Sequence, residues 1–153
     1  MTNINKAIET TLDVSRNVWK YAADIETNFD PGLPLVPCFP DELNQVFLNL
    51  IVNAAHAIEE KNKNTESQKG TITITTKQNN NWAEICIKDT GKGIPGEHDS
   101  RIFDPFFTTK EVGKGTGQGL SIVHSVITKK HKGEISFESK VNEGTSFLVR
   151  LPL

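Results

Sequence analysis

The sequence has few of the features that mark membrane proteins, disulfide-rich proteins or metal-binding proteins. It has no uninterrupted apolar stretch long enough to cross a membrane, because the longest, residues 47–52, contains Asn49. Its two cysteines, Cys38 and Cys86, are far apart and match no metal-binding or redox spacing, so we expect both to be small buried hydrophobic side chains. Residues 1–7 are polar and show no signal peptide. We therefore expect a soluble, cytoplasmic domain.

The chain also lacks a large excess of charge of either sign. Its 17 Lys and Arg residues and 19 Asp and Glu residues give a net charge of −2 and an isoelectric point of about 6.1. A protein that binds nucleic acid usually carries a clear basic excess, so we expect no nucleic-acid partner. The length of 153 residues fits a single globular domain with a substantial core, and no internal repeat divides it.

The most informative stretch is residues 41–60, which is predicted to be a helix that is apolar almost all round. Further apolar surface on its flank comes from Leu48, Val52 and Ala55. A helix of this kind is usually buried, and we expect Asp41 to be its N-cap. Its broad apolar face carries Leu43, Val46, Phe47, Leu50, Ile51, Ala54 and Ile58.

One narrow polar stripe remains on this helix. It consists of Glu42, Asn49, Asn53, His56 and Glu60. A buried amide without a partner costs about 1–3 kcal/mol, so each of these groups must find one. For a lone buried Asn, another protein group would be the better explanation. Two Asn residues one turn apart, with a histidine on the same stripe, favour a groove lined for a ligand.

Apolar periodicity predicts the remaining elements. Helical spacing predicts short amphipathic helices over residues 5–21 and 120–130. Alternation of apolar and polar residues predicts strands over residues 23–29, 71–77, 82–88, 134–139 and 146–151. The last four strands form two hairpins. The expected fold class is therefore an α/β (α+β) two-layer sandwich, in which a mixed, mostly antiparallel sheet of about five strands is covered on one face by about three helices.

The first of two glycine-rich segments, residues 89–95, follows a predicted strand. Its glycines allow a tight turn and close approach of the backbone to a ligand, although such strand ends are also common ordinary turns. Gly91, Gly93 and Gly96 match the G-x-G-x-x-G spacing of dinucleotide-binding proteins. We reject that function, because Pro95 lies inside the motif and no βαβ unit surrounds it.

The second glycine-rich segment, residues 113–120, leads directly into the helix predicted over residues 120–130. Successive free N–H groups at a helix N-terminus bind anions, and the helix dipole assists them. Flexible linkers are also glycine-rich, but they seldom adjoin a strong amphipathic helix, so we favour phosphate binding. A Walker A loop is excluded, since neither Gly-Lys pair is followed by Ser or Thr.

An aromatic segment, residues 101–110, lies between the two glycine-rich segments. Its aromatic residues are Phe103, Phe106 and Phe107. Solvated phenylalanine rings are costly, so these must dock on another part of the protein, and their position favours a hinged lid with aromatic anchors. The four histidines show no metal-binding spacing, and we expect His124 and His131 to be surface residues.

In this order and spacing, these segments resemble the catalytic, ATP-binding domain of bacterial sensor histidine kinases. That domain belongs to the Bergerat-fold superfamily, which also includes gyrase B and mismatch-repair ATPases. The four boxes are the N box at residues 49–54 (NLIVNA), the first glycine box at 89–95 (DTGKGIP), the F box at 103–107 (FDPFF) and the second glycine box at 115–120 (GTGQGL). A final glycine motif follows at 143–145 (EGT). The resemblance covers the chain from residue 33 onward, and four ordered boxes make it specific.

The resemblance implies ATP and Mg²⁺ as ligands and assigns roles to several residues. Asp89 would accept the amino hydrogen of adenine with support from Thr145, and Asn53 would coordinate Mg²⁺ with help from Asn49. Gln118 replaces the Leu common in the second glycine box, which affects only the packing of the lid. The other implied ATP-binding residues are His56, Ala57, Gly91, Lys92, Gly93, Ile94, Thr109, Lys110, Gly115, Thr116, Gly117, Gln118, Gly119 and Leu120, and the implied lid anchors are Phe103, Phe106 and Phe107.

The resemblance also implies a reaction. Related ATPases place a Glu one turn before the metal-binding Asn to activate water, whereas this chain has Asn49 at that position. The domain should therefore hydrolyse ATP poorly and deliver the γ-phosphoryl group to a histidine. Phosphoryl transfer of this kind depends mostly on positioning and charge neutralisation.

No histidine with a surrounding helical hairpin suits the role of phosphoacceptor in this sequence. The resemblance therefore implies a separate, histidine-bearing dimerisation domain, a response regulator downstream and a homodimeric parent kinase, with or without a membrane anchor. We expect residues 1–30 to be the linker helix and first strand that follow the dimerisation domain. Residues 31–153 would form the ATP-binding domain, and the fragment would be monomeric.

Two other functions stay open. The chain is also compatible with a regulator that binds nucleotide without catalysis, but the intact Asp89, Asn53 and lid glycines argue against degeneration. A Ser/Thr kinase of the anti-sigma type resembles this domain too, although such kinases usually have a different arrangement around the N box.

Overall fold

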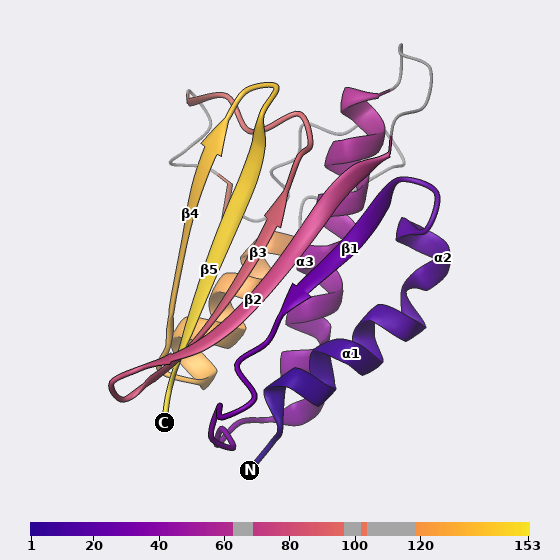
Figure 1. Ribbon diagram of the computed structural model, residues 1–153. Coiled ribbons are helices and arrows are strands. Elements are labelled where there is room, and N and C mark those ends of the chain that lie inside the picture. The colour runs from indigo at the N-terminus through magenta and orange to yellow at the C-terminus, as the bar shows by residue number, and fades with distance from the viewer. Residues whose placement is uncertain (63–68, 97–101, 104–118) are drawn as a thin grey trace.

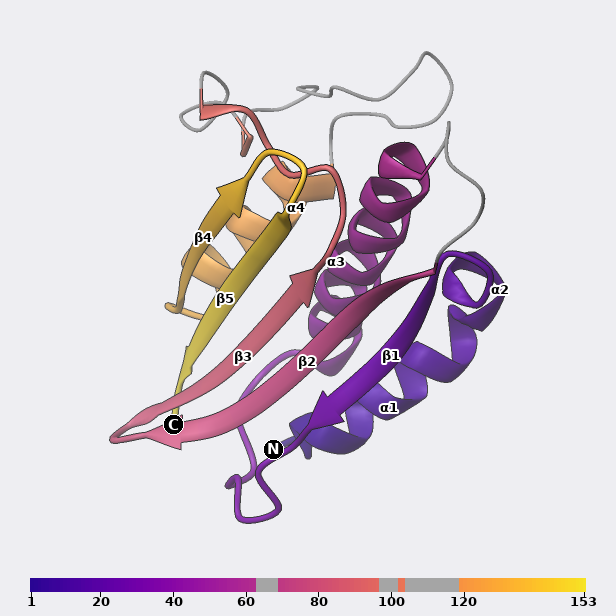
Figure 2. The same cartoon turned by 45° about the horizontal axis from the view of Figure 1, so that its top comes forward.

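The computed structural model describes residues 1–62, 69–96, 102–103 and 119–153, which form a sheet with a layer of helices packed on one of its faces (Figure 1). In chain order the elements are α1 (Ile4–Val14), α2 (Arg16–Trp19), β1 (Ala23–Asn28), α3 (Pro40–Lys61), β2 (Gly70–Asn79), β3 (Trp82–Asp89), α4 (Gly119–Ser125), the π-helical segment η2 (Val126–Lys130), β4 (Glu134–Lys140) and β5 (Gly144–Pro152). The tilted view shows the same two layers, with both chain termini at one end (Figure 2). The expected two-layer α/β fold is confirmed.

The described strands form one sheet in the order β1-β2-β3-β5-β4. β1 and β2 are parallel and are connected through α3, whereas the other neighbouring pairs are antiparallel. Asn80 and Asn142 lie in the turns of the two hairpins with φ angles of 55° and 65°. Asn adopts this left-handed conformation more readily than most residues, which fits its place in both turns. The mixed, mostly antiparallel sheet is as predicted.

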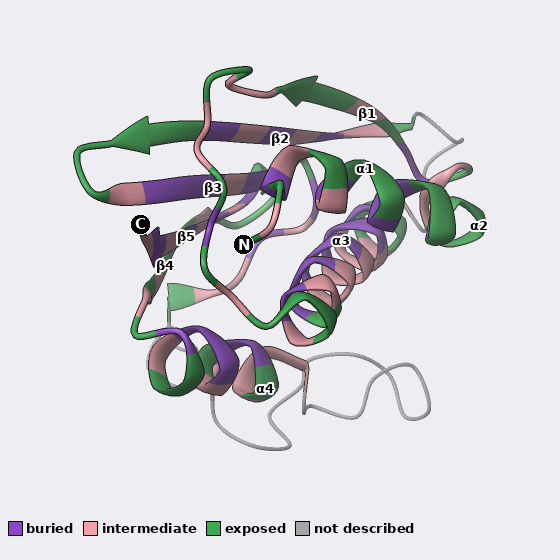
Figure 3. Ribbon diagram, turned by 90° about the horizontal axis from the view of Figure 1, so that it is seen from below, coloured by how far each residue is buried: buried purple, intermediate pink, exposed green. Residues whose placement is uncertain are grey.

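Helix α3 fills the space between the sheet and the other helices. All residues of its predicted apolar face are buried, and buried residues concentrate between the two layers (Figure 3). The prediction that Asp41 is the N-cap was wrong. Phe39 occupies the N-cap, because Pro40 suits the first helical position, where its missing N–H costs nothing. Asp41 and Glu42 instead lie in the first turn, where their charges favour the helix dipole.

The N-terminal residues pack into the same core as the rest of the chain. The single helix expected over residues 5–21 is two helices, which divide at Ser15, whose hydroxyl donates to the carbonyl of Thr11 at 2.7 Å. The amide of Asn5 accepts a hydrogen bond from Thr76 on β2 at 2.7 Å. The residues of α1 that enter the hydrophobic core are Ile4, Ile8 and Leu12.

The helix predicted over residues 120–130 consists of α4 followed by the π-helical segment η2. His131 follows η2 and was predicted to be exposed, but only 7% of its surface is accessible. Its Nδ1 lies 2.9 Å from the carbonyl of Val126, and its Nε2 accepts the backbone N–H of Phe39 at 3.0 Å. The proton of this ring therefore lies on Nδ1, and the histidine connects the end of η2 to the start of α3. His124 is exposed, as predicted.

Two further expectations concern the cysteines and the membrane. Cys38 and Cys86 are free, but both are partly exposed rather than buried, which corrects the prediction. Cys86 lies on the open face of the sheet, with its Sγ 3.2 Å from the hydroxyl of Ser146. None of the helices in the described part of the chain is both long and apolar enough to cross a bilayer.

We predict that His131→Ala lowers the free energy of unfolding by about 1–3 kcal/mol, because the N–H of Phe39 loses its partner and the carbonyl of Val126 keeps only the backbone N–H of residue 131. Chemical denaturation measures this difference. Lys129→Ala, at an exposed position of η2, is the matched control and should change stability by less than about 0.5 kcal/mol. Equal effects of the two substitutions would contradict the structural role of His131.

Candidate functional site

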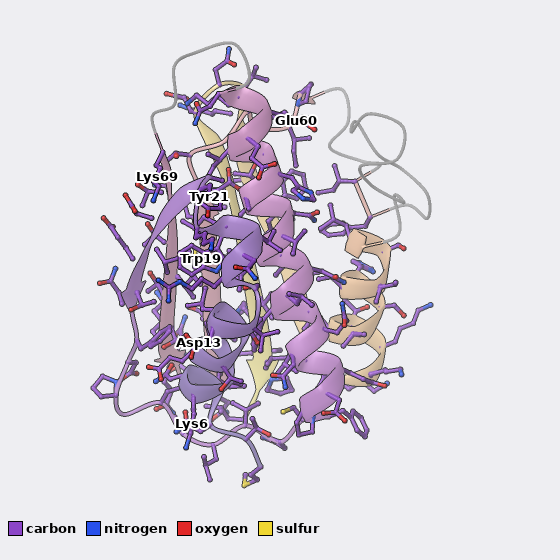
Figure 4. All side chains as sticks on the ribbon, turned by 90° about the vertical axis from the view of Figure 1, so that its right-hand side faces the viewer. Lys6, Asp13, Trp19, Tyr21, Glu60 and Lys69 are labelled. Atoms are coloured by element: carbon purple, nitrogen blue, oxygen red, sulfur yellow. The ribbon has the colours of Figure 1, made fainter. Side chains whose placement is uncertain are left out.

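Among the predicted site residues that the structure describes, those at the end of β3, in the turn after it and in the C-terminal half of α3 lie at the end of the molecule opposite the chain termini. β3 ends there, β4 turns into β5 there, and the C-terminal half of α3 lies behind them (Figures 1 and 2). Glu60 marks this end of α3, whereas Lys6 of α1 lies at the opposite end of the protein (Figure 4). Segments far apart in the sequence thus meet at the carboxyl end of β3.

Asp89 is the last residue of β3 and is almost entirely buried, with 4% of its surface accessible. Its Oδ1 accepts the backbone N–H of Gly91 at 2.8 Å. Burial raises the pKa of this carboxyl from 3.8 to about 6, while backbone hydrogen bonds from Gly91 and Thr145 and the positive charge of Lys61 act in the opposite direction. A buried carboxyl with a raised pKa marks a candidate functional site, because its ionised form gains most from a ligand that donates a hydrogen bond.

The turn after Asp89 rests directly on α3. A Cβ at Gly91 would lie 2.6 Å from the side chain of Ala57, so only glycine fits at this contact. The next residue, Lys92, donates its backbone N–H to the carbonyl of Ala57 at 3.1 Å, and its side chain forms an ion pair with Glu60. These contacts fix the distance between the end of β3 and the polar stripe of α3.

The other side of the same turn rests on the hairpin between β4 and β5. Gly93 has a φ angle of 75°, and a Cβ there would lie 2.1 Å from the carbonyl oxygen of Lys140. The carbonyl of Lys92 accepts the N–H of Asn142 at 2.7 Å, and the N–H of Ile94 donates to the hydroxyl of Ser139 at 2.7 Å. The turn is therefore held between a helix and a hairpin, and its two glycines are required by close contacts.

The polar stripe of α3 begins and ends in ion pairs. Glu42 pairs with Lys130 of η2 at 2.5 Å, and Glu60 pairs with Lys92 as described above. Between them, Asn49 accepts a hydrogen bond from Gln45 at 3.0 Å. Asn53 and His56, which complete the stripe, are half-buried.

The start of α4 lies beside this stripe. A Cβ at Gly119 would lie 4.0 Å from the side chain of Asn49, and Leu120 follows on the same helix with partial burial. The other predicted residues of the second glycine box and the lid lie outside the described residues: Thr109, Lys110, Gly115, Thr116, Gly117 and Gln118, together with the lid anchors Phe106 and Phe107.

Phe103 is the one predicted lid anchor that the structure describes. Its ring centroid lies 5.1 Å from that of His124 on α4, 6.1 Å from that of Phe137 and 6.5 Å from that of Phe147. The neighbouring Ile102 is buried in the main core. This pair of residues is attached to the helix-covered face of β4 and β5.

Two residues at this site were not predicted from the sequence. Ser139 contacts the turn after β3 through Ile94, and Lys61 donates to the carbonyl of Thr90 at 3.3 Å. The alternation along β4 contained a usable signal for Ser139. It lies six residues before Thr145 across a tight hairpin turn, so the two pair directly and face the same side.

Within the described residues, no three His, Cys, Asp or Glu side chains are placed to hold a metal ion together. A divalent ion at this site would therefore need oxygen ligands from a bound molecule in addition to those of the protein. The amide oxygens of Asn49 and Asn53 are of the type that Mg²⁺ accepts.

Comparison with known proteins gives consistent results. The family model of histidine kinase-, DNA gyrase B-, and HSP90-like ATPases matches residues 39–153. Sensor histidine kinase ZraS of Escherichia coli K12 is 38% identical over 152 residues, which cover 99% of this chain and 30% of that protein. Sporulation kinase C of Bacillus subtilis is 35% identical over 154 residues, which cover 100% of this chain and 33% of that protein.

Among solved structures, the nucleotide-free catalytic domain of histidine kinase ThkA matches with a TM-score of 0.82 and 30% identity, covering 99% of this chain and 93% of that one. The similarity therefore extends over the N-terminal helices as well as the residues that the family model matches. The chain spans about a third of the length of the curated relatives named above.

We predict that Asp89→Asn stabilises the protein at neutral pH by about 1–3 kcal/mol. The pKa of Asp89 is about 6 in the folded state and 3.8 in the unfolded state, so the folded state binds the proton more tightly. The protonated carboxyl of Asp89 therefore stabilises the fold fully below pH 4, and this stabilisation is lost as the pH rises through 6. The stability difference between variant and parent should therefore grow from pH 4 to pH 7, as measured by denaturation at several pH values.

Asp24→Asn is the matched control for this pH series, because Asp24 lies on β1 with 75% of its side chain accessible. Its stability curve should run parallel to that of the parent protein over the same pH range. If the curve of Asp89→Asn is also parallel, the proposed raised pKa of Asp89 is wrong.

A further prediction concerns the turn after β3. Gly93→Ala should lower the free energy of unfolding by about 1–3 kcal/mol, because the φ angle of 75° is unfavourable for alanine and its methyl group would meet the carbonyl of Lys140. Gly96→Ala is the control, since nothing lies within 4 Å of a Cβ there. Thermal and chemical denaturation compare the two variants, and a neutral effect of Gly93→Ala would show that the turn relaxes freely.

Proposed function

Because this chain belongs to the family of histidine kinase-, DNA gyrase B-, and HSP90-like ATPases, we propose that it binds ATP and donates the γ-phosphoryl group to a histidine of a sensor kinase. The ATP-binding face is the surface between the carboxyl end of β3, the polar stripe of α3 and the start of α4. The acceptor histidine lies on a separate dimerisation domain, and a response regulator receives the phosphoryl group afterwards.

The observation that carries this proposal is the buried carboxylate of Asp89. One of its oxygens is already occupied by the N–H of Gly91, so the ligand meets an acceptor in a fixed orientation. The exocyclic amine of adenine is a donor that matches it, whereas the carbonyl oxygen of guanine or hypoxanthine at the same place would be repelled. Discrimination of this kind is strong in a buried site, because the wrong base gives the carboxylate oxygen that faces it no donor.

The phosphate end of ATP is assigned to the stripe of α3 and the residues that precede α4. Asn53, with Asn49 one turn away, would hold Mg²⁺ through an amide oxygen, and phosphate oxygens and water would have to provide the other ligands. When bound, Mg²⁺ neutralises phosphate charge. His56 contacts phosphate from the same stripe, and backbone N–H groups of residues 115–119 and the side chain of Lys110 complete the phosphate site.

The reaction that this residue set favours is transfer to a protein side chain rather than hydrolysis. The stripe of α3 carries Asn49 where a catalytic base would be needed to activate water, and an amide cannot take up a proton. Positioning of the γ-phosphoryl group next to an incoming histidine then provides most of the rate acceleration.

The place of this domain in a longer kinase follows from the same proposal. The curated relatives are about three times as long as the chain, which leaves room for the dimerisation and sensing parts. Residues 1–30, which include α1 and β1, connect the ATP-binding domain (residues 31–153) to the dimerisation domain. The parent kinase is a homodimer, whereas the isolated domain is a monomer.

The first experiment is titration of the protein with Mg·ATP by calorimetry. We expect a dissociation constant between micromolar and sub-millimolar for the parent protein, and weakening of about 100-fold or more for Asp89→Asn, which replaces an acceptor by a donor. Asp24→Asn should bind like the parent. Asn53→Ala should still bind ATP, but the affinity should no longer depend on Mg²⁺.

Equal affinity of Asp89→Asn and parent for ATP would rule out the proposed adenine contact. The phosphoryl acceptor is tested separately, by adding a histidine-bearing dimerisation domain of a related kinase and radiolabelled ATP. Acid-labile phosphate on that domain supports histidine as acceptor. Acid-stable phosphate on a serine substrate would instead support a Ser/Thr kinase, and binding without any transfer would support a regulator.

A further inference from the structure

Ser139, near the end of β4, holds together the two segments that surround Asp89. Its hydroxyl accepts the N–H of Ile94 at 2.7 Å, which ties it to the turn after β3. The same hydroxyl lies 3.1 Å from the carbonyl oxygen of Gly144 and 2.8 Å from the hydroxyl of Thr145, which ties it to the start of β5. One side chain thus bonds both segments.

The register of the sheet explains why this connection reaches Asp89. Ser139 pairs with Thr145, and Thr145 pairs with Asp89, so the three residues form a row across β4, β5 and β3. Because side chains alternate along a strand, all three lie on the face covered by helices. The carboxyl of Asp89 receives one backbone hydrogen bond from Gly91 in the turn and one from Thr145 in β5. Its two donors therefore come from the two segments that Ser139 connects.

The number of protons on the two hydroxyl groups decides which of them donates a hydrogen bond to the other. A serine hydroxyl has one proton, and the carbonyl oxygen of Gly144 can only accept. If Ser139 donates to Gly144, the hydroxyl of Thr145 must donate to Ser139, which then also accepts from Ile94. The oxygen of Thr145 is left with lone pairs alone, so it presents an acceptor beside Asp89.

We propose that Ser139 is a positioning residue for recognition of the adenine base, acting through the turn after β3 and through Thr145. It touches no ligand itself. It fixes the orientation of the Asp89 carboxylate and keeps the hydroxyl of Thr145 as an acceptor, so that both match a base that carries an amino group. This inference rests on the proposed function, because it assigns the base end of the same site.

The test compares binding of ATP and of inosine triphosphate, in which a carbonyl oxygen replaces the exocyclic amine. Ser139→Ala should weaken ATP binding about tenfold and change inosine triphosphate binding by less than about twofold. Ser136→Ala is the matched control, since Ser136 lies on the exposed face of the same strand. It should leave both affinities unchanged. Equal weakening of both nucleotides, or no weakening of either, would overturn the proposal.

A second measurement needs no nucleotide and separates this inference from the proposed function. In the free protein, amide hydrogen exchange of Ile94 and Gly91 should be faster in Ser139→Ala than in Ser136→Ala. Unchanged exchange at both amides would overturn the positioning role. If Ser139→Ala does not fold, Ser139→Cys carries the same expectation, because a thiol is a weak acceptor and donor.

Together, the two measurements distinguish failure of the proposed function from failure of the inference about Ser139. Failure of the parent protein to bind ATP would contradict the proposed function, and the exchange measurement would still decide whether Ser139 organises the turn. Binding of ATP by the parent with unchanged discrimination in Ser139→Ala would contradict this inference alone.

Discussion

The buried carboxyl of Asp89 is the constraint on which the arrangement of this end of the molecule depends. Removing an ionisable carboxyl from water raises its pKa to about 6, so the fold must hold it where backbone donors reach it. Those donors come close only if neighbouring residues have no side chain. A Cβ at Gly144 would lie 1.9 Å from the carbonyl oxygen of Asp89, and one at Gly91 would meet α3. Glycine is therefore required at these two positions because the backbone around the buried carboxyl leaves no space for a Cβ, in addition to any requirement of a ligand.

Helix α3 imposes the second constraint. Its apolar face must pack against the sheet, which leaves its polar stripe at one margin of the interface between the layers. The ion pairs of Glu42 with Lys130 and Glu60 with Lys92 stabilise the two ends of this stripe. Because Lys92 belongs to the turn that follows Asp89, the contact between this turn and α3 sets the separation of the buried carboxylate from Asn53. The carboxyl of Asp89 and the amide of Asn53 are thus placed by one set of contacts.

Much of this structure follows from local patterns in the sequence, and the exceptions have physical reasons. The apolar face of α3, the two hairpins and the mixed sheet follow from periodicity, because burial on one face acts on every residue of an element. The N-cap was misassigned because the preference of Pro40 for the first turn prevailed over that of Asp41 for the cap. His131 was misassigned because its burial depends on Phe39, which lies 92 residues away in sequence. Ser139 was missed because its partners come from two other segments, the turn after β3 and the start of β5.

The candidate site also lowers the stability of the ligand-free protein. An ionised Asp89 without a ligand is unfavourable at neutral pH, and the glycines at positions 93 and 144 contribute no side chain to the packing around it. A ligand that donates to this carboxylate would recover that free energy, because it pairs a charge that the fold has already removed from water. Affinity for an amino-bearing base would therefore come partly from relief of an existing cost. If the proposal holds, Ser139 would keep the carboxylate from turning toward another partner before the base binds.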